Sequence, residues 1–156
     1  MKFAEFEAGQ IIDAGSVTIS EQQIIDFAKQ FDPQWFHTDP RAAGKSRWNG
    51  LIASGWHTCS MAMRLLADNV LAGSESFASP GLTNLRWKNP VRPGDTLHLQ
   101  LHVNDVRRAR SRSTLGVVQW KWQMNNQCGD SVLELDATSM FDLHDGHNLH
   151  YGEEVR

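Results

Sequence analysis

The sequence predicts an α+β domain in which one curved antiparallel sheet packs on a mostly buried central helix. Three observations predict it: an amphipathic helical segment near the N-terminus, a second and more apolar helical segment, and a C-terminal half in which apolar and polar residues alternate. The chain has 156 residues, 40% of them hydrophobic and 21% charged, as in an ordinary globular domain. One hydrophobic core is therefore expected, with no repeat or low-complexity linker to divide it.

The first clear element is a helix over about 20–31. Its apolar residues recur at helical spacing: Ile24, Phe27, Ala28 and Phe31. Two pairs of residues at its start have the form of a capping box: Ser20 with Gln23, and Thr18 with Glu21. Asp32-Pro33 ends the helix, because the residue before a proline is displaced from the α region.

An irregular segment follows over 32–54, about 23 residues long. It contains several residues that interrupt regular structure: Pro33, Pro40, Gly44 and Gly50. A structureless loop of this length is uncommon in a compact domain and is usually functional. This segment is therefore the first place to look for a site.

A second helix is predicted from Gly55 to about Leu71, ending before Gly73. One apolar stripe runs along it: Trp56, Cys59, Met63, Leu66 and Val70. Other apolar residues widen the stripe until polar residues are a minority, so the helix is expected to be buried.

Strands are expected over 11–17, 82–91, 95–106, 114–124 and 131–141, with a turn at 125–130. In the third of these, Leu97, Leu99, Leu101 and Val103 alternate with polar residues. The last four strands are expected to form an antiparallel meander, and 11–17 is a candidate for pairing at its start. The apolar face of such a sheet needs cover, which the second helix supplies.

Charge argues against a nucleic-acid partner. Fifteen Lys+Arg against eighteen Asp+Glu give a net charge of −3, which provides no global positive field. The basic run over 107–112 falls at an expected hairpin turn, where such charge is usually solvated; contact with the phosphates of coenzyme A or with an acidic carrier is the alternative.

His144, His147 and His150 follow the last strand, but Gly146 among them favours a loose tail over a metal site.

The cysteines and the N-terminus predict a cytoplasmic location. Cys59 and Cys128 form no metal-binding or redox motif. The first residues are acidic, without the apolar stretch of a signal peptide, and no 18-residue apolar run is present, so no membrane span is expected.

The long segment places an acid and an imidazole five residues apart, at Asp32 and His37. A carboxylate and a histidine that converge on one water can act as a general acid/base pair, although Asp before Pro is also a common way to end a helix. Gly55 opens the second helix, where free backbone N–H groups and the helix dipole attract developing negative charge. A glycine that only permits a tight turn is the simpler alternative.

Three motifs in this order resemble the MaoC-like dehydratases, the (R)-specific enoyl-CoA hydratase group of the hotdog fold. They are Asp32-x-x-x-x-His37-x-Asp39-Pro40, Ala53-Ser54-Gly55, and the stretch from Leu85 to Asp95. The resemblance covers most of 5–143. It implies a single hotdog domain over 1–143, with a C-terminal tail over 144–156, in which an antiparallel sheet wraps a long central helix.

The resemblance implies that Asp32 and His37 are the catalytic acid/base residues and that the Gly55 N–H binds the thioester oxygen. The implied reaction is the reversible hydration of a trans-2-enoyl-CoA to a 3-hydroxyacyl-CoA. Coenzyme A is part of the substrate, and no metal or redox cofactor is implied. A homodimer, or a larger assembly of dimers, is also implied. Six further residues are expected to bind substrate: Gln34, Trp35, Phe36, Trp56, Ser60 and Arg86.

The sequence departs from the family motif, in which Asn and Pro commonly stand where this chain has Gln34 and Trp35. We expect this change to alter packing near the acyl group. Two alternatives share the fold: a thioesterase, in which the acid activates water against the thioester carbonyl, and a noncatalytic acyl-CoA-binding protein. Fold alone does not decide among them, although a binder needs neither Asp32 nor His37.

Overall fold

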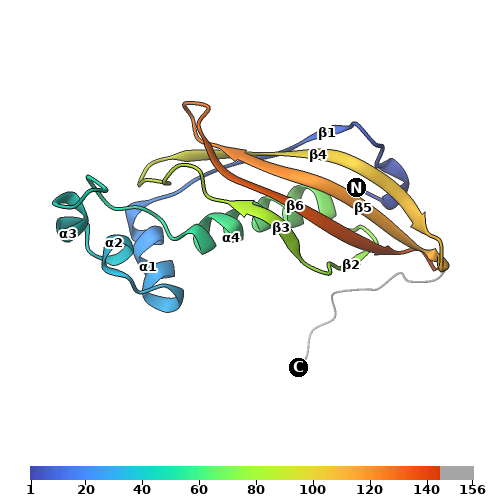
Figure 1. Ribbon diagram of the computed structural model, residues 1–156, viewed down its shortest axis with the longest axis horizontal. Helices are drawn as coiled ribbons and strands as arrows, with labels where there is room; N and C mark the ends of the chain where they lie inside the picture. The colour runs from blue at the N-terminus through green and yellow to red at the C-terminus, as the bar shows by residue number, and fades with distance from the viewer. Residues whose placement is uncertain (145–156) are drawn as a thin grey trace, which may run out of the picture.

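The structure, a computed structural model, describes residues 1–144 and shows an antiparallel sheet curved around one side of a central helix (Figure 1). The helices are α1 (Glu21–Phe31), α2 (Trp35–Thr38), α3 (Pro40–Gly44) and α4 (Gly55–Leu66), with short helical segments η1 (Phe3–Glu5) and η2 (Ala67–Leu71). The strands are β1 (Ile11–Thr18), β2 (Ser76–Ala78), β3 (Leu82–Arg86), β4 (Thr96–Ala109), β5 (Arg112–Asn125) and β6 (Ser131–Asp142). The predicted α+β class is confirmed.

The sheet has the order β1-β4-β5-β6, and both β2 and β3 pair with β6. The predicted meander holds for β4, β5 and β6, and β1 pairs with β4. The expectation that 82–91 precedes 95–106 in that meander is wrong, because β3 ends at Arg86 and lies beyond β6. Pro90 and Pro93 lack the N–H that a strand ladder needs. The chain from 87 to 95 instead passes the start of α4, where the Val91 carbonyl accepts from the Ala53 N–H.

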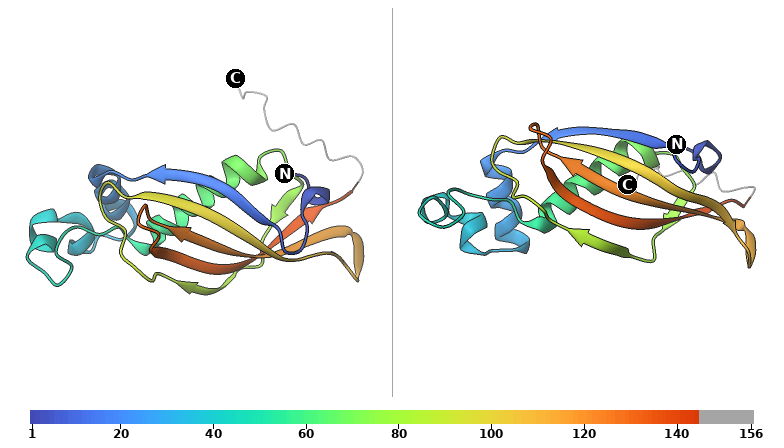
Figure 2. Two further views of the ribbon diagram at one scale, coloured as in Figure 1. Left: turned by 90° about the horizontal axis from the view of Figure 1, so that it is seen from above. Right: turned by 45° about the horizontal axis from the view of Figure 1, so that its top comes forward.

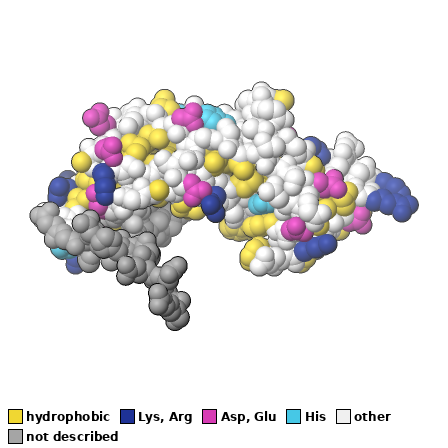
Figure 3. Space-filling view, turned by 180° about the vertical axis from the view of Figure 1, so that it is seen from behind, with side chains coloured by type: hydrophobic (Ala, Val, Ile, Leu, Met, Phe, Trp, Pro, Cys, Tyr) yellow, Lys and Arg dark blue, Asp and Glu magenta, His cyan; other side chains and the backbone are white. Residues whose placement is uncertain are grey.

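The core lies between the concave side of the sheet and α4. Its fully buried side chains include Leu97, Leu99, Leu101, Trp120, Leu133, Leu135 and Phe141. The expectation that α4 is buried around most of its surface is wrong: it buries Ala62, Leu65 and Leu66, whereas Trp56 is 59% and Met63 43% exposed. The sheet covers only one side of α4, so the other side of its apolar stripe reaches the surface. On the rear face, hydrophobic side chains are visible in the middle of the molecule (Figure 3).

The helix α1 begins as predicted. The Ser20 Oγ accepts from the Gln23 N–H at 3.2 Å, and the Gln23 Oε1 accepts from the Ser20 N–H at 2.8 Å, so the capping box is complete. The expectation of an irregular 32–54 segment is only partly right, because α2 and α3 form within it. Asp39 caps α3 and Pro40 occupies its first turn, where a missing proline N–H costs nothing.

The three short helices α1–α3 gather at one end of the sheet, and the tip of the β4–β5 hairpin lies at the other end (Figures 1 and 2). The arginine-rich run over 107–112 forms that tip, as predicted. Within residues 1–144, no helix combines the length and apolar character that a bilayer span requires. The tail over 145–156, with His147 and His150, lies outside the described residues.

Candidate active site

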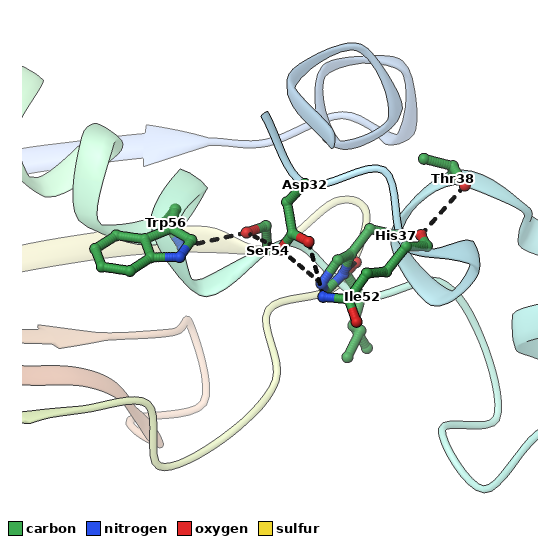
Figure 4. Close-up of polar contacts among 7 residues, drawn as sticks. Asp32, His37, Thr38, Ile52, Ser54 and Trp56 are labelled. Atoms are coloured by element: carbon green, nitrogen blue, oxygen red, sulfur yellow. Dashed lines mark hydrogen bonds and ion pairs between the residues drawn. The ribbon is translucent and has the colours of Figure 1, made fainter. Parts of the chain in front are cut away.

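The site forms where α1 ends, α2 begins and α4 starts (Figure 4). Asp32 is the residue that follows α1, and Pro33 prevents the helix from continuing. The chain turns at Gln34 into α2, which carries His37. This turn places the His37 Nε2 3.3 Å from the Asp32 Oδ2. The two residues that the sequence analysis singled out are therefore direct neighbours.

A backbone contact determines which nitrogen of His37 carries hydrogen. His37 is buried, with 5% of its surface exposed. The Nδ1 of its imidazole lies 2.8 Å from the Ile52 carbonyl oxygen. Because a carbonyl only accepts, Nδ1 is the donor. In the neutral ring, Nε2 and the Asp32 Oδ2 are then two acceptors that face each other. A proton on Nε2, or one water that donates to both atoms, satisfies this pair.

Two side chains hold the Asp32 carboxylate. The Ser54 Oγ donates to its Oδ2 at 2.7 Å, and the Gln34 Nε2 donates to its Oδ1 at 2.7 Å. Burial acts to raise the pKa of the Asp32 carboxyl, but these two hydrogen bonds and the charge that His37 can carry outweigh burial and hold the pKa below its ordinary value. Asp32 is therefore a carboxylate, and it can accept hydrogen from water.

The N-terminus of α4 provides a hydrogen-bond donor beside this pair. Ser54 caps the helix, because its Oγ accepts from the Trp56 N–H at 3.3 Å. Gly55 is the first helical residue, so its N–H has no intrahelical acceptor, and within the described residues 1–144 no other group accepts from it. The positive end of the helix dipole adds to the attraction for a developing oxyanion at this N–H.

Asp32, His37 and Gly55 line one cavity of about 420 Å³. Four aromatic residues are among its other lining residues: Phe36, Trp48, Trp56 and Trp87. The Phe36 ring packs edge-on against the His37 imidazole, with 4.3 Å between ring centroids, and Phe36 in turn lies 6.2 Å from the Trp48 ring. This arrangement supplies water-activating groups and an oxyanion donor within a partly apolar space.

Of the six residues expected to bind substrate, only three line this cavity: Gln34, Phe36 and Trp56. The structure does not bring the other three to it. Trp35 points outward from α2 and is 49% exposed. The Ser60 Oγ donates to the Trp56 carbonyl and lines a separate, apolar cavity of about 550 Å³. Arg86 is an exposed residue at the end of β3, outside both cavities.

Two basic residues near the cavity have structural partners, and the basic run over 107–112 lies far from it. Lys88 lines the cavity that contains Asp32 and His37, but its Nζ is 2.7 Å from the Glu134 Oε1. Arg92 donates to the Trp48 carbonyl. The basic run over 107–112 is at the opposite end of the sheet from α1–α3 (Figure 1). Because the length of the sheet separates them, that run does not contact a ligand bound in the cavity of its own chain.

Sequence reasoning missed two side chains of the site. Ser54 is fully buried and joins Asp32 to the start of α4; a serine directly before a helix is a cap signal that could have found it. Trp87 lines the cavity and packs on Gly55. No local pattern marks that contact, because 32 residues separate the two positions.

Comparison with known proteins identifies the class of this domain. The MaoC like domain family matches residues 4–123, most of the chain. The chain belongs to this family, the MaoC-like dehydratases. A curated relative is uncharacterized protein YdeM of Bacillus subtilis, 33% identical over 134 residues, which span 86% of this chain and 94% of YdeM.

Solved structures agree with this assignment. The MaoC-like dehydratase from Rhodospirillum rubrum is 34% identical, with a TM-score of 0.83, and the match covers 91% of this chain and 97% of that one. An (R)-hydratase from A. caviae is 23% identical, with a TM-score of 0.72 and coverage of 86% and 96%, and shows the shared fold. The predicted hotdog fold is confirmed, and the chain is a member of the MaoC-like dehydratase family.

Proposed function

We propose that this protein is a hydro-lyase that reversibly hydrates a trans-2-enoyl-CoA thioester to a 3-hydroxyacyl-CoA. One observation carries the proposal: the His37 Nε2 and the Asp32 Oδ2 lie 3.3 Å apart, in the cavity that Gly55 also lines. Addition of water to a conjugated thioester requires a group that activates the water near C3 and a donor that stabilises the negative charge on the thioester oxygen.

In the hydration direction, a water held between the His37 Nε2 and Asp32 attacks C3 of the enoyl group. The new C3–O bond forms as the C2–C3 double bond moves toward C1, and negative charge develops on the thioester oxygen. The Gly55 N–H donates to that oxygen. One proton leaves the water for the acid/base pair and one proton is delivered to C2, so that water is added across the double bond. Dehydration follows the same steps in reverse.

Each step uses water and groups of the chain, so the proposed reaction requires no metal or redox cofactor, and coenzyme A enters as part of the substrate. The mostly acidic charge balance supports neither nucleic acid nor membrane as a partner, and we place the protein in the cytoplasm.

We also propose a homodimer, or a larger assembly built from dimers, joined through the sheet edge that β2 and β3 form. Phe77 and Leu82 at this edge are 60% and 45% exposed. A sheet edge carries unpaired backbone groups that a second copy can pair. Sedimentation of the purified protein tests this, and a monomer at micromolar concentration would contradict it.

Incubation with crotonyl-CoA and longer trans-2-enoyl-CoA esters tests the reaction. We expect the absorbance of the conjugated thioester to fall without release of free thiol. Asp32→Asn and His37→Gln should each lower kcat by at least about a hundredfold, as for loss of a general acid/base. Asp105→Asn and His98→Gln, which change the same residue types on exposed parts of β4, serve as matched controls and should retain activity.

Other outcomes would overturn the proposal. Thiol release with loss of absorbance would identify a thioesterase. Binding of the esters without any turnover would identify a noncatalytic acyl-CoA-binding protein. A fully active Asp32→Asn variant would remove the mechanism described here.

A further inference from the structure

Two tryptophans meet over the N-terminus of α4. The rings of Trp56 and Trp87 are 5.5 Å apart between centroids and nearly perpendicular, at 76°. Trp87 also packs on the backbone of Gly55: a Cβ at position 55 would lie only 2.3 Å from the Trp87 Cε2. A residue with a side chain at position 55 would therefore push the indole away. We call Trp56 and Trp87 together the indole wall.

The indole wall stands between two cavities. The catalytic cavity of about 420 Å³ contains Asp32 and His37, and the apolar cavity of about 550 Å³ lies between α4 and the sheet. Among the described residues, Trp56 is the one that lines both cavities. Trp87 lines the catalytic cavity but not the apolar one.

The apolar cavity has the character of a site for a hydrocarbon chain. Its walls come from α4, from the segment 71–82 and from the inner faces of β5 and β6, and include Met63, Leu66, Trp122, Leu135 and Ala137. No Lys, Arg, Asp or Glu is among its lining residues within the described part of the chain. An acyl chain would gain from burial in it, whereas a charged group would lose hydration there without a partner.

We propose that the indole wall determines the acyl-chain length that this enzyme accepts, by closing the apolar cavity to substrates in the catalytic cavity. The inference rests on the proposed function. With the thioester oxygen at the Gly55 N–H and C3 at the Asp32–His37 pair, the reacting atoms lie on the catalytic side of the wall. Carbons further along the acyl chain must pass Trp56 to enter the apolar cavity, because Trp56 lines both cavities. The wild-type enzyme is therefore specific for short enoyl groups.

The wall can be removed without opening the core. Trp56 is 59% and Trp87 45% exposed, so truncation of either side chain leaves few buried contacts unfilled. Trp56→Phe keeps an aromatic ring at the boundary, whereas Trp56→Ala opens it. Ile11, 62% exposed on β1 and outside both cavities, offers Ile11→Ala as a control for loss of an exposed apolar side chain.

The test is kcat/KM for trans-2-enoyl-CoA esters of four, six, eight and ten carbons. For the wild type, Trp56→Phe and Ile11→Ala, we expect kcat/KM to fall as the acyl chain lengthens from four to ten carbons. For Trp56→Ala, the ratio of the eight-carbon to the four-carbon value should rise by at least tenfold, since each methylene that enters the apolar cavity is worth roughly fourfold, or about 0.8 kcal/mol. An eight-to-four ratio that is unchanged in Trp56→Ala would overturn the proposal.

A binding measurement separates this inference from the proposed function. Saturated butyryl-CoA and decanoyl-CoA are titrated calorimetrically into the same full-length variants. If no enoyl-CoA is hydrated by the wild type, the proposed reaction fails. A gain in decanoyl-CoA affinity in Trp56→Ala alone still supports the wall, and equal affinities in all variants refute it.

Discussion

Replacement of Ser54 by alanine tests whether one buried hydroxyl supports both the fold and the site. Its Oγ donates to the Asp32 Oδ2 at 2.7 Å and accepts from the Trp56 N–H at 3.3 Å. Loss of an N-cap side chain costs about 0.5–2 kcal/mol, and loss of a hydrogen bond to a charged group about 1.5–3 kcal/mol. Because the cap bond is long and Gln34 still donates to Asp32, we expect the free energy of unfolding to fall by roughly 2–3 kcal/mol.

The same substitution should change the pH dependence of activity. The Ser54 hydrogen bond lowers the pKa of Asp32, so its loss raises that pKa. If hydration needs the Asp32 carboxylate, the acid limb of the kcat/KM profile moves to higher pH. We also expect kcat to fall by about tenfold, which corresponds to about 1.4 kcal/mol of lost transition-state stabilisation.

A second cap serine provides the control. Ser20 caps α1 through a comparable bond to the Gln23 N–H but does not contact Asp32. Ser20→Ala should lower the free energy of unfolding by about 1 kcal/mol and leave the acid limb at its wild-type pH. Ser54→Thr retains the hydroxyl, so its acid limb should also lie at the wild-type pH and not at the higher pH of Ser54→Ala. Urea unfolding and pH–rate profiles measure both effects. An acid limb that does not move in Ser54→Ala would refute the reasoning.

Three further predictions concern titration and packing. The pKa of Asp32 is lowered in the folded state. The Asp32 carboxylate therefore contributes fully to the free energy of unfolding above about pH 3.9, and this contribution is lost as the pH falls through the folded pKa. In urea unfolding measured across pH, Asp32→Asn should remove that pH-dependent contribution. Burial lowers the pKa of His57, whose ring stacks on Phe27 at 4.4 Å, so stability should decline as the pH falls below about 6.5, and His57→Phe should flatten that decline. Gly55→Ala should destabilise the fold by about 1–3 kcal/mol through overpacking, and Trp87→Ala in the same chain should recover much of that loss, as measured by thermal unfolding; an additive loss in the double variant would contradict the contact.

Local sequence patterns were sufficient to predict the helices and strands whose signals span only a few residues. The capping box of Ser20 and Gln23 and the four-residue periodicity located α1, and strict alternation located β4. Asp32 and His37 could be paired from sequence because they are five residues apart and a proline makes the chain turn between them. Gly55 was singled out by its place at the start of the second helix, and the family motif joined it to that pair; the catalytic roles of all three residues are predictions.

Long-range packing decided the rest. Sequence alternation shows that 82–86 can be a strand but not that it pairs with β6, because ladder partners are chosen by the whole sheet. The apolar stripe of α4 could not reveal that Trp56 stays exposed, since only the position of the sheet decides which side is covered. Ser54 meets Asp32 across 22 residues and Trp87 meets Gly55 across 32. The sequence by itself therefore determined the two long helices α1 and α4, most strands and the pairing of Asp32 with His37. Tertiary packing alone determined the buried hydroxyl that holds Asp32 and the indole wall beside Gly55, because contacts between distant segments leave no periodic signal in either segment.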